Sequence, residues 1–301
     1  MCCKDMSISY MNIAIVKYWG KKEYNPYLIP LVPSISYRAK NLYTKTKIES
    51  SDIDEFYLND KLQDKVQCKK IFSYIDKIVK NRPKLKVTSY NTMPTAAGLA
   101  SSASAYSALI QEINKFFNLN LSIEQMAKYA SIGSGSAGRS FYELCAFDEN
   151  GNIYELHTDL NLCMSAIIIS KEKKSISSRD AMQHCIDTSP YMNEWVEVGI
   201  RSFNDMKKAL LDNDFTKIGE IMEYNTMFMH KTMKTANPPF TYLTNESIEC
   251  IEYIKELRNK GYQIYFTTDA GPNVKVLYLK EDEEKIINKL KEKYKDKVIE
   301  C

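Results

Sequence analysis

One segment of small residues constrains the fold of this chain more than any other. It runs from Pro94 to Leu109, reads "PTAAGLASSASAYSAL", and is dominated by Ala, Gly and Ser in a chain otherwise rich in Lys, Tyr and Ile. Apolar residues recur at helical spacing from Tyr106 to Phe117, which predicts a long amphipathic helix beginning with "LASSASA". The small residues therefore lie at the amino end of a helix, where backbone N–H groups and the helix dipole attract anions.

Strand and helix patterns occur in both halves of the chain. β-branched and aromatic residues predict strands over residues 8–18 and 34–50, and "KLKVTSYNTM" predicts a strand before the small-residue segment. Ser122 and Gln125 are placed for a capping box at the start of a second helix. The remaining predicted elements are the strands "GNIYEL", "LCMSAIIIS", "YQIYFTTD" and "NVKVLYL", and helices near 190–212, 214–231, 245–260 and in "EDEEKIINKLKEKYKD".

The mixture of strands and helices in both halves predicts an α+β protein of two domains. The apolar run "LCMSAIIIS" begins a new strand-then-helix pattern, so we expect an N-terminal domain over 1–164 and a C-terminal domain over 165–301. In the helix near 245–260, Ile248, Ile251, Ile254 and Leu257 are expected on one face.

The charge and cysteine content exclude several classes of function. Basic and acidic residues number 41 and 38 and are interleaved, so no basic face predicts binding to nucleic acid or to an anionic membrane. The eight cysteines form no Cys-x-x-Cys pair, which indicates a reducing compartment rather than a zinc site. No signal peptide or membrane-spanning run is visible, so we expect a cytoplasmic protein with no membrane partner.

The small-residue segment has two interpretations. Its backbone amides, with the Ser101 and Ser102 hydroxyls, could bind phosphate and ligate Mg²⁺, which prefers oxygen ligands. Alternatively, Ala and Gly could let the helix pack closely against a sheet, and this segment alone does not decide between the two. A Walker loop is excluded because no G-x-x-x-x-G-K-S/T pattern occurs.

Three further motifs carry charged residues next to turns. Arg139 stands in "GSGSAGRS", where it could bind a carboxylate or phosphate, or pair with a structural carboxylate. Asp269 ends a strand in "TTDAGPN", as a base would, although an ordinary Asx-turn has the same sequence. Lys17 and Lys21 in "NIAIVKYWGKK" suit an anion, or an exposed charged loop. None of the three histidines has the spacing of a triad or metal site.

Read in order, six segments closely resemble the diphosphomevalonate decarboxylases of the GHMP kinase superfamily, from about residue 12 to 279. They are "NIAIVKYWGKK", "PTAAGLASSASA", "GSGSAGRS", "SSRDAM", "MHKTMKTANPPFTYL" and "TTDAGPNVKVL". The resemblance implies a domain like ribosomal protein S5 domain 2, a ferredoxin-like C-terminal domain and a cleft between them. It also implies a lyase of the mevalonate pathway of isoprenoid biosynthesis that uses ATP and Mg²⁺ to decarboxylate mevalonate 5-diphosphate.

The resemblance also implies roles for individual residues. Catalytic roles fall on Asp269, Arg139 and Lys17, with Ser101 and Ser102 as candidate Mg²⁺ ligands. Substrate contacts fall on Tyr18, Lys21, Ser136, Arg139 and Ser178. The ATP-binding residues would be Pro94, Ala96, Ala97, Gly98, Leu99, Ala100, Ser101, Ser102 and Ser104.

Two alternatives to this function stay open. A related enzyme could act on mevalonate monophosphate, or could phosphorylate the 3-hydroxyl without decarboxylation. A catalytically silent relative could bind a metabolite without turnover. Among such relatives a homodimer is common, so we expect one here.

Overall fold

The computed structural model describes residues 6–24, 27–92, 101–172 and 175–301. Within these residues, seven strands form one sheet in the order β6-β5-β7-β4-β8-β9, with β1 paired antiparallel to β4. The longest strand, β4, pairs with three neighbours because its seventeen residues offer hydrogen bonds on both edges over their whole length. The strands are β1 (Ser7–Val16), β4 (Ser34–Ser50), β5 (Glu55–Leu58), β6 (Lys61–Leu62), β7 (Leu85–Asn91), β8 (Leu144–Phe147) and β9 (Ile153–Glu155).

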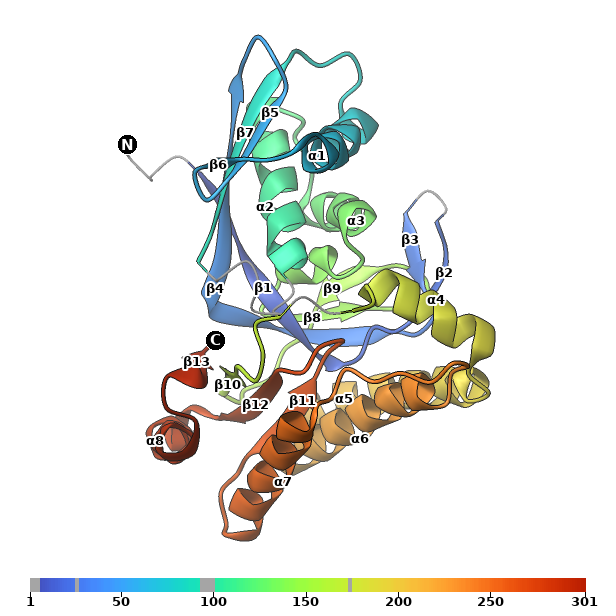
Figure 1. Ribbon diagram of the computed structural model, residues 1–301, viewed down its shortest axis with the longest axis vertical. Helices are drawn as coiled ribbons and strands as arrows, with labels where there is room; N and C mark the ends of the chain where they lie inside the picture. Colours follow the sequence, from blue (N-terminus) through green and yellow to red (C-terminus); the bar gives the residue numbers. More distant parts are fainter. Residues whose placement is uncertain (1–5, 25–26, 93–100, 173–174) are drawn as a thin grey trace.

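Three helices lie on one side of this sheet (Figure 1). They are α1 (Lys65–Ile78), α2 (Ser101–Phe116) and α3 (Ile123–Gly133). The predicted capping box at the start of α3 is confirmed, since the side chains of Ser122 and Gln125 each bond the other's backbone N–H.

The described part of the small-residue segment packs helix α2 against the sheet. Ala103 and Ala108 are fully buried. The hydroxyl of Ser107 accepts a hydrogen bond of 2.8 Å from Ser9 of β1. The hydroxyls of Ser104 and Thr44 of β4 are 2.7 Å apart. Small side chains allow this close approach, so the packing interpretation is confirmed for this part of the segment, whereas residues 93–100 lie outside the described residues.

Four strands of the described C-terminal half form a second, antiparallel sheet in the order β11-β12-β10-β13. Its strands are β10 (Leu162–Ile167), β11 (Tyr265–Thr268), β12 (Val274–Leu279) and β13 (Val298–Glu300). Both faces of this sheet are covered. Tyr265 and Leu277 face the helices α5 (Met192–Leu211) and α6 (Phe215–Lys234), whereas Phe266 and Val276 face α7 (Asn245–Asn259) and α8 (Glu283–Tyr294). This alternation follows from the two-residue period of a strand.

The two sheets share one hydrophobic core. Met11 and Ile13 of β1 belong to the same buried cluster as Phe203 and Met206 of α5 and Ile218 of α6. Helices α5 and α6 thus contact the first sheet as well as the second, as Figure 1 shows. This shared core holds the ends of β1 and β11 in fixed relative positions.

Two expectations from the sequence concern the domain boundary and the buried face of α7. The division into 1–164 and 165–301 stays a prediction, and residue 164 falls inside β10. Ile248 is not on the buried face of α7, because 44% of it is exposed while Ile251, Ile254 and Leu257 are buried. Ser247 takes the buried position in the first turn, since its hydroxyl donates to the carbonyl of Pro272 at 2.7 Å.

Over the described ranges, none of the helices combines the length and apolar character needed to cross a bilayer.

Candidate active site

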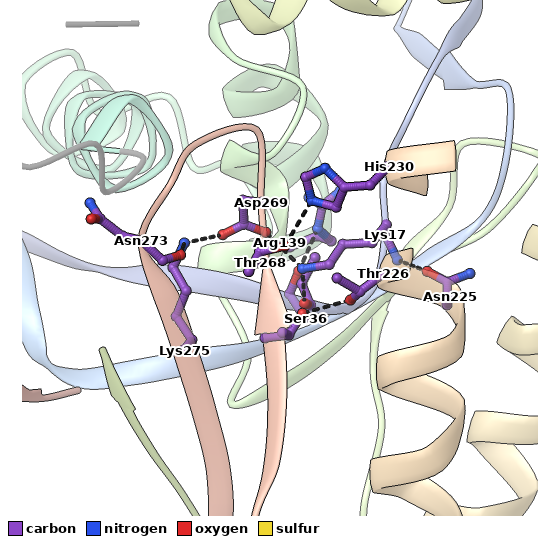
Figure 2. A network of polar contacts seen from close by, with 12 residues as sticks. Lys17, Ser36, Arg139, Asn225, Thr226, His230, Thr268, Asp269, Asn273 and Lys275 are labelled. Atoms are coloured by element: carbon purple, nitrogen blue, oxygen red, sulfur yellow. Dashed lines mark hydrogen bonds and ion pairs between the residues drawn. The ribbon is translucent and has the colours of Figure 1, made fainter. Parts of the chain in front are cut away.

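Asp269 directly follows β11 and is held by contacts from helix α6. The hydroxyl of Thr267 lies 2.9 Å from that of Thr226, and the hydroxyl of Thr268 lies 2.7 Å from Nε2 of His230. Figure 2 shows these side chains of α6 reaching the strand end that carries Asp269. Polar bonds inside the core therefore fix the backbone from which this carboxylate extends.

The turn after Asp269 is fixed as firmly as the strand before it. The side-chain oxygen of Asn273 accepts hydrogen bonds from the backbone amides of Ile169 at 2.7 Å and Ser170 at 3.0 Å. The backbone amide of Gly271 donates to the carbonyl of Asp269 at 2.8 Å. The Asp269 carboxylate binds lysine side chains rather than its own turn, so this is not an ordinary Asx-turn.

Two ammonium groups hold the Asp269 carboxylate. Nζ of Lys17, just after β1, lies 2.8 Å from Oδ1, and Nζ of Lys275, in β12, lies 3.0 Å from Oδ2. Both lysine side chains are 2% exposed, whereas the Asp269 side chain is 34% exposed. Lys17 also donates from Nζ to the carbonyl of Ala14 at 2.7 Å, and its backbone amide donates to Asn225 at 2.7 Å. The carboxylate is thus fixed by buried cations and open on another side.

These contacts shift the proton affinities of the pair. Burial lowers the pKa of Lys17 to about 8, although the Asp269 charge opposes this change. Burial alone would raise the pKa of Asp269, but the charges of Lys17 and Lys275 hold it well below its ordinary range. Asp269 is therefore ionised at neutral pH before any ligand binds.

Arg139 is a buried cation close to this pair. It lies in the short helix η2 (Ala137–Ser140) and is 2% exposed. Its Nε donates to the Ser36 hydroxyl at 2.7 Å, and its Nη1 donates to the Ser34 hydroxyl at 3.1 Å. Its guanidinium lies 5.2 Å from the centre of the Tyr18 ring. Among the described residues, no carboxylate lies within ion-pair distance of Arg139, and burial lowers its pKa. Such a site favours an anionic ligand.

The start of α2 and the "GSGSAGRS" loop meet beside Arg139. The hydroxyl of Ser102, near the start of α2, lies 3.2 Å from that of Ser134, which lies 3.4 Å from that of Ser136. Asn12 of β1 donates from Nδ2 to the carbonyl of Ser136 at 2.9 Å. The structure therefore brings the amino end of α2 next to the loop that carries Arg139.

The other residues expected at the site take several positions. The ring of Tyr18 stacks on Phe147 at 6.2 Å, and a Cβ atom at Gly135 would lie 2.7 Å from the Tyr18 hydroxyl, so the loop approaches this ring closely. Lys21 begins the strand β2 (Lys21–Tyr24), and Ser178 begins the helix α4 (Ser178–Thr188). Both segments border one buried cluster, which includes Trp19, Ala181 and Met182.

The predicted ATP-binding residues are only partly described. Ser104 is fully buried against β4, and its role in ATP binding stays a prediction. Ser101 begins α2. The remaining predicted positions lie outside the described residues, namely Pro94, Ala96, Ala97, Gly98, Leu99 and Ala100.

Two residues beside Asp269, Lys275 and His230, were not predicted from the sequence. Lys275 stands in the otherwise apolar strand "NVKVLYL", and it becomes a buried cation because both faces of that strand are covered, which the sequence does not show. His230 has no sequence signal, because its contact with Thr268 joins residues 38 positions apart. Among the residues that the structure describes, no three His, Cys, Asp or Glu side chains lie together as metal ligands.

Comparison with known families accounts for nearly the whole chain. Residues 9–159 match a family model described as the diphosphomevalonate decarboxylase-like N-terminal domain, and residues 164–300 match the mevalonate 5-diphosphate decarboxylase C-terminal domain. The diphosphomevalonate decarboxylase of Candida albicans is 30% identical over 310 residues, which cover 93% of this chain and 85% of the relative.

Solved structures agree with these matches. The mevalonate pyrophosphate decarboxylase of Streptococcus pyogenes has a TM-score of 0.92 and 41% identity, covering 98% of this chain and 95% of the other. The mevalonate diphosphate decarboxylase of Staphylococcus aureus has a TM-score of 0.92 and 35% identity, covering 98% and 94%. The expected GHMP kinase fold is confirmed by these likenesses. The chain belongs to the diphosphomevalonate decarboxylase family of enzymes.

Proposed function

We propose that this protein catalyses the ATP-dependent decarboxylation of mevalonate 5-diphosphate to isopentenyl diphosphate, ADP, phosphate and CO₂. The observation that carries the proposal is the Asp269 carboxylate, partly open and surrounded by the buried cations Lys17, Lys275 and Arg139. Three cations around one carboxylate leave an excess of positive charge, which suits a substrate bearing phosphates and a carboxylate. A structure described as MDDEF in complex with MVAPP, AMPPCP and magnesium, at 34% identity, supports the proposal.

Asp269 is placed to act on the substrate's tertiary hydroxyl. Each carboxylate oxygen accepts one lysine hydrogen bond and keeps a second lone pair, and the side chain is 34% exposed. Asp269 orients the 3-hydroxyl and takes its proton as the oxygen attacks the γ-phosphoryl group of ATP, and ADP leaves. Lys17, whose ammonium keeps one unused N–H, offsets the negative charge that the transferring group spreads over its oxygens.

Arg139 is placed to hold the substrate carboxylate. Its contacts with Ser34 and Ser36 use two of five N–H groups, so three remain for a carboxylate. When the new phosphate leaves C3, the bond between the carboxylate and its neighbouring carbon breaks, and that electron pair forms the alkene as CO₂ departs. Arg139 would align this bond with the departing phosphate, so that positioning supplies much of the rate. Tyr18, Lys21, Ser136 and Ser178 would contact the rest of the substrate.

Mg²⁺ and ATP would bind at the start of α2. Ser102 presents its hydroxyl there and links to the Arg139 loop through Ser134. Mg²⁺ keeps phosphate and water ligands and needs few protein oxygens, which agrees with serine hydroxyls rather than an acidic cluster. When bound, the ion would neutralise phosphate charge. We assign Ser101 and Ser102 to the metal, and the loop from residue 94 with Ser104 to ATP. The homodimer and the cytoplasmic location stay predictions.

Product analysis tests this proposal. The protein is incubated with ATP and either mevalonate 5-phosphate or mevalonate 5-diphosphate, and CO₂, ADP and phosphate are measured. We expect equal amounts of CO₂ and ADP with the diphosphate only. ADP without CO₂ would indicate a 3-kinase, and turnover of the monophosphate alone would indicate the other related enzyme.

An Asp269→Asn variant tests the role of the carboxylate. We expect turnover to fall by about two to four orders of magnitude while ATP binding is retained, because Asn cannot take the proton. No products from the unaltered protein would support a silent metabolite-binding relative. An active Asp269→Asn variant would refute the role assigned to Asp269.

A further inference from the structure

Lys275 is a buried lysine whose direction is set by the strand that carries it. In β12 it pairs with Thr267 of β11 and Ala166 of β10, so it lies in the middle of the second sheet. Residues alternate along a strand, and Leu277, two positions on, belongs to the core shared by the two sheets. The side chain of Lys275 therefore extends toward the first sheet, where its ammonium meets Asp269 (Figure 2).

A buried lysine in this position needs a compensating anion. Its side chain is 2% exposed, and its contacts from Nζ are Oδ2 of Asp269 at 3.0 Å and the carbonyl of Asn273 at 3.3 Å. Asp269 is therefore its single anionic partner among the described residues. Since Lys17 holds the other carboxylate oxygen at 2.8 Å, the two lysines fix both the position and the rotation of the carboxylate.

We propose that Lys275 is a positioning residue for the phosphoryl-transfer step: with Lys17, it holds Asp269 ionised and fixed in orientation until the substrate hydroxyl binds. The inference rests on the proposed function and adds a residue to it. A carboxylate held on both oxygens cannot rotate away from the incoming hydroxyl, and the second ammonium keeps it free of a proton under acidic conditions. Removal of Lys275 should therefore raise the pH at which Asp269 takes up a proton, and should lower kcat more than it changes KM.

The other charged groups around Asp269 are few. Lys17 faces it from the end of β1, and Arg139 from η2, and both cations remain in a Lys275 variant. His230 faces it from α6, and burial lowers the pKa of His230 to about 3, so each Lys275 variant is also titrated with His230→Gln in place, which removes this second titrating group. The change in Asp269 titration on removing Lys275 thus reports the charge of Lys275 itself.

The test measures Asp269 directly. The carboxyl carbon of Asp269 is followed by ¹³C NMR against pH in protein labelled at aspartate, with Asp269→Asn to assign the signal. Lys275→Met keeps the length of the aliphatic part of the side chain without the ammonium, and Lys275→Gln keeps a hydrogen-bond donor. We expect both substitutions to raise the pKa of Asp269 by about one unit or more, and kcat to fall by about tenfold or more while KM changes by less than about threefold. Lys47→Met, which removes a strand lysine paired with Glu49 at 3.0 Å, is the matched control and should change neither quantity.

Two results would overturn the inference. One is an Asp269 titration that stays at its original pH in both Lys275 variants. The other is a shifted titration with an unchanged kcat, which would show that Lys275 does not serve the reaction. The titration uses the free protein and needs no turnover. If the unaltered protein released no CO₂ and no ADP, the proposed function would fail, and the NMR result would still decide whether Lys275 holds Asp269.

Discussion

Substitution of Arg139 should lower activity strongly while it changes the unfolding free energy little. In the ligand-free state it is a buried cation that contacts the hydroxyls of Ser36 and Ser34 and faces the Tyr18 ring. Replacing it in Arg139→Met loses two hydrogen bonds of about 1.5 kcal/mol each and a ring contact of about 1 kcal/mol. Against this, the substitution removes the desolvation penalty of an unpaired buried ion, which is several kcal/mol. We therefore expect the unfolding free energy to change by no more than about 2 kcal/mol.

The same substitution should remove most of the activity. A substrate carboxylate would take two of the three remaining N–H groups of Arg139, and charged hydrogen bonds contribute about 1.5–3 kcal/mol each. The loss of about 3–6 kcal/mol corresponds to a fall in kcat/KM between about a hundredfold and ten-thousandfold. CO₂ release at low substrate concentration measures this quantity.

Arg82 supplies a matched control with the opposite expectation. It is also buried, but it pairs with Asp54 at 2.7 Å and Asp76 at 2.9 Å. Arg82→Met leaves Asp54, which is 22% exposed, without this partner, so we expect stability to fall by about 2–4 kcal/mol and activity to persist. At about 2.1 cal/mol/K per residue over 301 residues, 3 kcal/mol corresponds to a Tm change of about 5 °C. If Arg139→Met lowered Tm by more than this and retained CO₂ release within tenfold, Arg139 would be a structural residue.

Three other substitutions or conditions test separate parts of the structure. Burial lowers the pKa of Lys17 to about 8, so kcat/KM should fall above that pH as the ammonium loses its proton. A pH profile of kcat/KM that stays flat to about pH 10 would contradict the role of the Lys17 ammonium in the reaction. Burial lowers the pKa of His230 from 6.5 to about 3, so the unfolded chain takes up a proton at a higher pH than the folded protein does. The unfolding free energy should therefore fall as the pH drops below 6.5. Urea unfolding should show a loss of about 2 kcal/mol at pH 5, and His230→Gln should remove this loss. An equal acid dependence in both proteins would refute it. A methyl group at Gly219 of α6 would lie 2.1 Å from the Tyr265 ring. We therefore expect Gly219→Ala to lower the unfolding free energy by about 1–3 kcal/mol, despite the higher helix propensity of alanine. An unchanged urea midpoint would count against this packing.

Part of the local order in this protein follows from the sequence alone. The capping box of Ser122 and Gln125, the strand over residues 34–50 and the acidic first turn of the last helix, at Glu283 and Glu284, all agree with the structure. Each depends on residues within a few positions of one another, so the pattern contains the physical cause. The same holds for Asp269, which the residues after it force into a turn at a strand end.

The tertiary structure alone decided which of these residues meet. Lys17 and Asp269 are separated by 252 positions, and only the core shared by the two sheets brings their side chains to 2.8 Å. Lys275 reads as an ordinary strand lysine until both faces of β12 are covered, and then its ammonium must find an anion inside the protein. Ile248 fits the helical period but meets solvent, because the neighbouring chain at Pro272 selects Ser247 instead. Burial and pairing depend on segments far apart in the chain, and a local pattern does not contain them.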